Sequence, residues 1–185
     1  MAIAITHASR QAAARVAGFA FLFYIVAGIT GMFIDDPSVS SLISVLTSLS
    51  AIALGVTLYA LTSDQGPVLA LFAMACRILE AIPTESGASN AIFFAVGSTI
   101  FAWLMPRGRL IPAALAWLGI VASALLVVIL PAQLAGLLGG SMAWSSSLTW
   151  YVWLPMLLFE VSLALWFLIK GVAMPSASVA PAGAD

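Results

Sequence analysis

Residues 67–83, PVLALFAMACRILEAIP, place two ionisable side chains inside an apolar run of the kind that crosses a membrane. The first ten residues are apolar, Arg77 and Glu80 follow, and a proline ends the run. Of the six Lys and Arg residues, only Arg77 lies in the middle of a long apolar run. Because a charge at that depth is costly in a membrane, it requires a partner. The surroundings of Arg77 therefore constrain how the helices pack.

The composition predicts a membrane protein. Of the 185 residues, 63% are hydrophobic and only 7% are charged, whereas a soluble domain carries about 25% charged residues. Several apolar runs reach the roughly 17–25 residues needed to cross a hydrocarbon core of about 30 Å. We expect an all-α, polytopic transmembrane helical bundle surrounded by the lipid bilayer. The net charge of −1 argues against nucleic acid as a partner.

Six membrane spans joined by short connections are predicted. The expected organisation is a cytoplasmic head (1–15), a six-span membrane bundle (16–172) and a disordered cytoplasmic tail (173–185), because the tail is rich in Ala, Ser and Pro. Residues 135–148 are Gly- and Ser-rich and are expected to form a loop at the interface. The expected spans cover approximately residues 16–34, 41–61, 67–83, 89–105, 110–134 and 150–169.

The charges between these runs predict the orientation of the bundle. If six spans alternate, five basic residues fall on one side, and the opposite side carries acidic residues and no Lys or Arg. Because cytoplasmic loops carry an excess of Lys and Arg, both termini are expected to be cytoplasmic. The basic residues are Arg10, Arg15, Arg107, Arg109 and Lys170, and the acidic ones are Asp35, Asp36 and Glu85.

Glu160 is the favoured partner of Arg77 because the two residues share a depth. Arg77 lies ten residues after Pro67, and Glu160 lies ten residues before Lys170. At 1.5 Å per residue, each is about 15 Å from the same end of its span, near the midplane. Glu80 lies one turn from Arg77 on the same face and is the alternative partner. The candidate site therefore comprises these three residues, as a ligand-binding cluster in a membrane cavity or as a structural ion cluster.

Serine and threonine are unusually frequent in the first half of the expected second span. Such hydroxyl groups commonly donate to carbonyls of their own helix, which is a structural role. The lining of a polar cavity is the alternative. The residues are Ser41, Ser44, Thr47, Ser48 and Ser50.

Residue types needed for other chemistries are missing from the spans. His7 is the only histidine and lies in the head, so a histidine-based metal site, a bis-His haem site and a histidine base for a serine nucleophile are excluded within the membrane. Cys76 is the only cysteine and has no internal disulfide partner. No Gly-rich phosphate loop is present. We therefore predict no catalytic residue, metal or cofactor, and an enzyme is the weakest hypothesis.

Four stretches in the expected order suggest a family. They are RQAAARVAGFAFLFYIVAG (10–28), FAMACRILEA (72–81), MPRGRLIPAALAWLGI (105–120) and FEVSLALWFLIKGV (159–172). Together they resemble the bacterial domain-of-unknown-function family 4386, integral membrane proteins with about six helices. Arg77 and Glu80 match the family's third-span pattern, Cys76 stands where the pattern has an aromatic residue, and Glu160 matches the closing motif. The resemblance implies the fold and a multi-pass location in a bacterial inner membrane, but no activity.

Two functional hypotheses follow from the buried charges. In the first, the protein binds or transports a small or lipid-like molecule at the Arg77, Glu80 and Glu160 cluster. In the alternative, it is a non-catalytic accessory or interaction subunit of a membrane complex, its partner is another membrane protein, and the charges are purely structural. A water-sized or larger cavity that adjoins Arg77 favours the first hypothesis, whereas a dry, fully packed pair favours the second.

Overall fold

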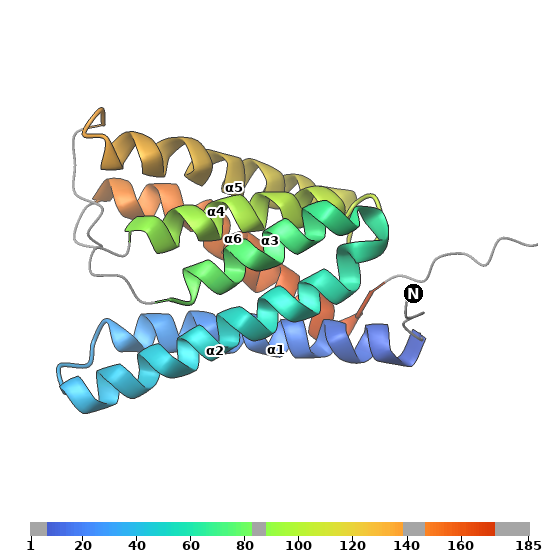
Figure 1. Cartoon of the computed structure of the whole chain (residues 1–185), viewed down its shortest axis with the longest axis horizontal. Coiled ribbons are helices and arrows are strands. Elements are labelled where there is room, and N and C mark those ends of the chain that lie inside the picture. The colour runs from blue at the N-terminus through green and yellow to red at the C-terminus, as the bar shows by residue number, and fades with distance from the viewer. Residues whose placement is uncertain (1–6, 83–87, 139–146, 173–185) are drawn as a thin grey trace, which may run out of the picture.

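The computed structural model describes residues 7–82, 88–138 and 147–172 as a helical bundle (Figure 1). Six α-helices are found in these residues, so the predicted all-α fold is confirmed. A short 3₁₀ turn, η1 (Ser63–Gln65), joins the second and third helices. The helices are α1 (His7–Gly31), α2 (Pro37–Thr62), α3 (Pro67–Glu80), α4 (Ala88–Leu104), α5 (Ala113–Leu134) and α6 (Ser147–Ile169).

The helices form a closed ring. Each one packs against its neighbours in sequence, and α6 packs against α1 to complete the circle. Consecutive helices run in opposite directions, with α1 and α2 along one side of the molecule (Figure 1). The buried apolar residues form one continuous core inside this ring. Side chains from helices that are distant in sequence, such as α3 and α6, therefore meet in the interior.

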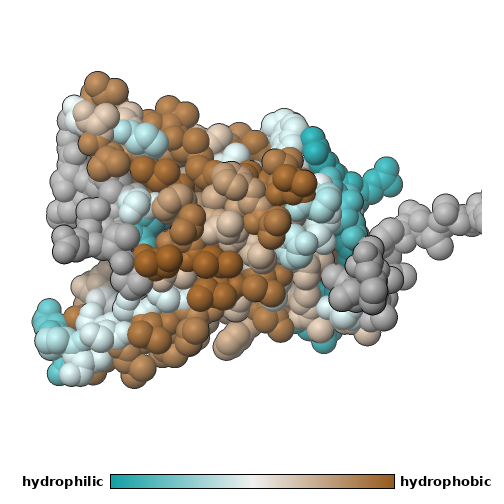
Figure 2. Space-filling view, in the orientation of Figure 1, coloured by the Kyte–Doolittle hydropathy of each residue, from teal (hydrophilic) through white to brown (hydrophobic). Residues whose placement is uncertain are grey.

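The outer surface of the bundle is apolar. Large hydrophobic side chains are exposed on the outward faces, among them Phe19, Leu42 and Trp117. Figure 2 shows apolar residues across the middle of one face, with hydrophilic residues gathered toward its ends. Among the described residues, four helices (α1, α2, α5 and α6) are long and apolar enough to cross a membrane. The chain is a helical membrane protein, as its composition predicts.

Helix α3 is shorter than the third span that the sequence predicts. Its 14 residues extend about 21 Å, whereas a hydrocarbon core is about 30 Å thick. The helix ends at Glu80 because Pro83 disfavours helical backbone at the preceding residue. The side-chain amide of Asn90 in α4 donates to the carbonyl oxygens of Glu80 and Ile82. It thereby satisfies groups that the end of a helix leaves without partners.

Helices α1 and α2 begin earlier than the sequence predicts. Helix α1 begins at His7, within the segment expected to be a head. Helix α2 begins at Pro37 because Asp36 caps it, accepting hydrogen bonds from the backbone nitrogens of Ser38 and Val39 at 2.9 and 3.0 Å. Proline at the first helical position favours the same start. The expected tail (173–185) and residues 139–146 of the expected loop lie outside the described residues.

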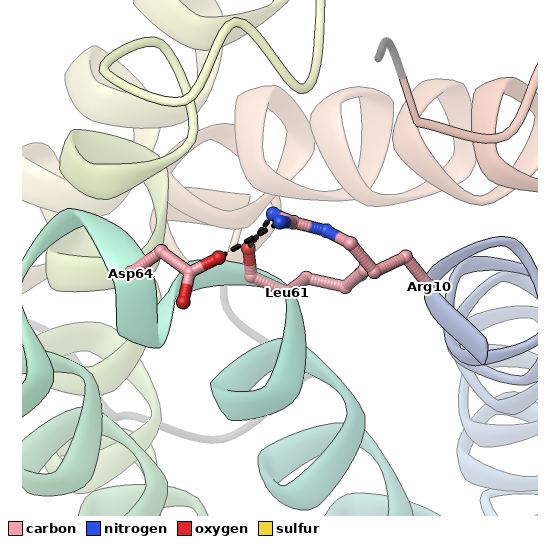
Figure 3. Close-up of polar contacts among 3 residues, drawn as sticks. All are labelled: Arg10, Leu61 and Asp64. Atoms are coloured by element: carbon pink, nitrogen blue, oxygen red, sulfur yellow. Dashed lines mark hydrogen bonds and ion pairs between the residues drawn. The ribbon is translucent and has the colours of Figure 1, made fainter. Parts of the chain in front are cut away.

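Hydrogen bonds and an ion pair hold several helix ends and connecting segments together at one end of the bundle. Arg10 donates from Nη1 to Oδ2 of Asp64 at 2.8 Å and from Nη2 to the carbonyl oxygen of Leu61 at 3.2 Å (Figure 3). Nε2 of Gln11 donates to the carbonyl oxygen of Val172 at 2.8 Å. The start of α1, the turn between α2 and α3 and the residues after α6 therefore meet. We call this the Arg10 end.

Substitution of a glycine on α1 provides a test of the close packing between α1 and α6. A Cβ atom on Gly18 would lie 2.8 Å from the carbonyl oxygen of Ala164 and 2.9 Å from Cγ of Leu168, both on α6. We expect Gly18→Ala to destabilise the protein by about 1–3 kcal/mol, because α6 must move away. Gly28→Ala on the same helix is the control, since nothing lies within 4 Å of its Cβ position. Thermal unfolding in mild detergent measures both, and equal melting temperatures would contradict the close α1–α6 contact.

Candidate functional site

Arg77 lies in the last turn of α3, inside the ring, with 1% of its surface exposed. Two glycines allow the neighbouring helices to approach it closely. A Cβ atom on Gly55 of α2 would lie 3.0 Å from Cβ of Arg77, and one on Gly97 of α4 would lie 3.1 Å from Cβ of Cys76. Because a larger residue at either position would displace α3, these glycines set the depth of Arg77 in the bundle.

The ion pair of Arg77 is formed with Glu80. Nη1 of Arg77 lies 2.9 Å from Oε2 of Glu80, and the two side chains are 1% and 5% exposed. The N–H groups do not point at the oxygen, so the contact lacks hydrogen-bond geometry and all three guanidinium nitrogens have no hydrogen-bond partner in the described residues. The attraction is therefore mainly Coulombic, and the donor capacity of Arg77 is left unused.

Glu160 lies on α6 across a small void from Arg77. Both residues line this void of about 10 Å³, together with Ser98. That volume is close to the smallest that holds one water molecule. Sequence reasoning favoured Glu160 as the partner of Arg77, but the ion pair in the structure is with Glu80. The reason is local, because Glu80 is the i+3 neighbour of Arg77 on the same helix.

Two aromatic residues complete the cluster. The hydroxyl of Tyr24 on α1 donates to Oε1 of Glu80 at 2.7 Å. The guanidinium carbon of Arg77 lies 5.4 Å from the centre of the Tyr24 ring and 5.0 Å from that of Phe94 on α4. These distances are within the range of cation–π attraction. Sequence reasoning missed both residues, and the hydroxyl of Tyr24 within an apolar run was the one available signal.

An apolar cleft of about 200 Å³ leads to the cluster between α1, α4 and α6. Its walls are mostly aliphatic and aromatic side chains, and Glu160 is the one acidic residue among the described residues that line it. Glu160 is 5% exposed, and its Oε1 atom has no hydrogen-bond partner among the described residues. The lining of the cleft includes Tyr24, Gly28, Phe94, Trp150, Trp153 and Leu157.

A second, polar cleft of about 270 Å³ lies beside the first, and the two share Gly28 and Thr47. It is lined by hydroxyl groups of α2 together with Glu80 and Asn90. Three of the five hydroxyl residues noted in the sequence line this cleft: Ser44, Thr47 and Ser48.

The remaining hydroxyls of this set bond within their own helix. Ser41 donates to the carbonyl oxygen of Pro37, and Ser50 donates to that of Leu46. Thr47 combines both roles, since it lines the cleft and donates to the carbonyl oxygen of Ile43 at 2.8 Å. The helix therefore uses its hydroxyls both for its own backbone and for the wall of a cavity.

The three residues predicted from sequence are thus brought together, and each has a distinct setting. Arg77 is enclosed, Glu80 borders the polar cleft, and Glu160 borders the apolar cleft. The cluster holds two carboxyl groups and one guanidinium. It can attract a positively charged or hydrogen-bond-donating group that enters by either cleft.

Comparison with known proteins bears on only part of this arrangement. No curated protein and no solved structure matches the chain. A family model does match, over residues that hold α4, α5, α6 and Glu160 but not Arg77 or Glu80. Residues 87–171 match the family described as a domain of unknown function (DUF4386), which confirms the resemblance predicted from the sequence.

Proposed function

We propose that the protein binds a small or lipid-like molecule inside the bundle, at the cluster of Arg77, Glu80 and Glu160. The observation that carries the proposal is the apolar cleft that the buried Glu160 lines. Ligand sites are typically concave and mostly apolar, with a few polar groups that fix the orientation of the ligand. Here the apolar walls suit a hydrocarbon portion, and Tyr24 and Glu160 contribute polar groups to the lining. Transport would require that such a ligand also leaves toward the opposite side.

The alternative, an accessory subunit with purely structural charges, is favoured by the enclosure of Arg77. That residue is 1% exposed and adjoins a void of about 10 Å³. We therefore assign different roles within the cluster. Arg77 and its ion pair with Glu80 hold helices in place, whereas Glu160 faces the site of the ligand.

We further propose that all six helices span the inner membrane of a bacterium, with both termini in the cytoplasm. The alternation of the helices supports this orientation, because it places Arg10 and the turn after α4 at the same end. The basic residues of the connecting segments are expected at this end of the bundle. An excess of Lys and Arg is typical of the cytoplasmic side of a membrane protein. The short α3 requires local thinning of the bilayer or snorkelling of its flanking residues, each at modest cost.

The orientation can be measured with reporter fusions. Alkaline phosphatase is active only outside the cytoplasm. A fusion after Asp36, between α1 and α2, should be active, and a fusion after Arg109, between α4 and α5, should be inactive. The reverse pattern of activities would overturn the proposed topology.

Gly28 provides a way to block both clefts without disturbing the core. It lines the two clefts, and nothing lies within 4 Å of its Cβ position. Octanol with bromine at its far carbon is a suitable probe, because bromine quenches the fluorescence of tryptophans that it contacts. In the wild-type protein we expect saturable quenching, since Trp150 and Trp153 line the cleft. Gly28→Leu should weaken this binding about tenfold or more, while its melting temperature stays near that of the wild type.

Two controls make this measurement specific. Gly28→Ala adds one methyl group to the same position and should retain most of the binding. Trp153→Phe should reduce the amplitude of the saturable quenching. If Gly28→Leu and the wild type show the same saturable quenching, or if quenching never saturates, the proposed binding site is wrong.

The ion pair can be tested by comparing two double-mutant cycles. Arg77→Ala or Glu80→Ala should each destabilise the protein by about 3–5 kcal/mol, because each leaves a buried charge without its partner. The double variant should be less destabilised than the sum, by a coupling of about 1–3 kcal/mol. The cycle of Arg77 with Glu160 should give a smaller coupling, since no ion pair joins them in the structure. Equal couplings in the two cycles would contradict the division of roles.

The exposed pair Arg10 and Asp64 provides the reference for these cycles. Its carboxylate is 63% exposed, so its coupling should fall within about 0–1 kcal/mol. Thermal or denaturant unfolding in one detergent measures all three cycles under the same conditions.

A further inference from the structure

The charges around the apolar cleft indicate which class of molecule would bind there. The cluster contains one guanidinium and two carboxyl groups, and the guanidinium forms its ion pair with Glu80. Glu160 therefore has no ion-pair partner among the described residues, although it is buried and its Oε1 atom accepts no hydrogen bond from them. No Lys or Arg lines the apolar cleft that Glu160 borders. A buried carboxylate is stabilised when a cation or a hydrogen-bond donor reaches it.

We propose that the cleft binds an amphipathic amine, with its ammonium group at Glu160 and its hydrocarbon chain along α1 and α6. This deepens the proposed function and rests on it. A primary ammonium group carries three donors and no acceptor, so it complements a carboxylate that has no ion-pair partner among the described residues and whose Oε1 atom accepts no hydrogen bond from them.

The walls of the cleft suit the remainder of such a molecule. Tyr24 and Trp153 line the same cleft as Glu160 and contribute aromatic surface to its walls. Leu157 lies three residues before Glu160 on the same helix and contributes apolar wall. Trp150, ten residues before Glu160, lies about 15 Å along the helix axis. An alkyl chain that extends from Glu160 toward Trp150 therefore remains in apolar surroundings throughout.

An anionic amphiphile is disfavoured by the same arrangement. Its head group would meet Glu160 and, in the adjoining polar cleft, Glu80. The guanidinium of Arg77 is buried and lines neither cleft. A neutral alcohol can donate one hydrogen bond to Glu160 but leaves its charge uncompensated. The expected order of affinity is therefore amine, then alcohol, then carboxylate.

Three matched probes test this order on the wild-type protein in a neutral detergent. They are octylamine, octanol and octanoate, each with bromine at the far carbon, and tryptophan quenching reports their binding. We expect the amine to bind about tenfold more tightly than the alcohol, because a charge-assisted hydrogen bond replaces a neutral one. The carboxylate should bind more weakly than the alcohol. Equal binding of amine and alcohol, or tightest binding of the carboxylate, would overturn the proposal.

Variants of Glu160 assign the preference to that residue. Glu160→Gln should remove the preference for the amine while octanol still binds, and Glu160→Asp should retain part of it. Asp64→Asn removes a carboxylate at the Arg10 end, away from the cleft, and should leave the preference unchanged. If Glu160→Gln retains the full preference, the ammonium site is elsewhere and the proposal fails.

The outcomes separate this inference from the function on which it rests. Saturable binding of octanol that Gly28→Leu abolishes, with no preference for the amine, supports the binding function and refutes the amine. Absence of saturable binding for all three probes refutes both.

Discussion

A guanidinium enclosed in an apolar helical bundle is the constraint on which the other features depend. An ionised side chain at mid-span costs roughly 2.5–3.5 kcal/mol on insertion scales, and a close ion pair recovers about 4 kcal/mol at an effective dielectric constant near 20. The pair of Arg77 and Glu80 therefore does not offset the cost of two charges alone. The Tyr24 hydroxyl, the two aromatic faces and the carbonyl end of α3 each add stabilisation.

The early end of α3 connects this ion pair to the clefts. Because the helix stops at Glu80, the pair lies in its last turn, where a cation is favoured by the helix dipole. The same end exposes carbonyl oxygens that Asn90 must satisfy. Beyond it, the polar cleft occupies the space between α1, α2 and the start of α4. One shortened helix thus provides both the surroundings of Arg77 and a cavity beside them.

The sequence predicts the six helices and the three ionisable residues of the cluster, because apolar runs and mid-run charges are read directly from residue order. The depth calculation also holds in one respect, since Arg77 and Glu160 border the same void. Whether Arg77 pairs with Glu80 depends on side-chain geometry within one helical turn. The spacing of residues in the sequence does not determine that geometry. Phe94 could not be distinguished from Phe19, because helices that are apolar on every face give no periodic signal; one is 2% exposed and the other 65%.

The burial of Arg77 and the access of Glu160 to a cleft distinguish the two functional hypotheses more clearly than the charges of these residues do. Arg77 would be needed in either case, because removing it leaves two buried carboxyl groups without a counter-charge. Glu160 differs, since a residue that only fixed helix register would be expected to contact its partner directly. Instead it lines both the small void and the apolar cleft, and its Oε1 atom accepts no hydrogen bond from the described residues. A buried acceptor of this kind costs stability unless a donor reaches it, and Arg77, whose ion pair is with Glu80, does not donate to this oxygen.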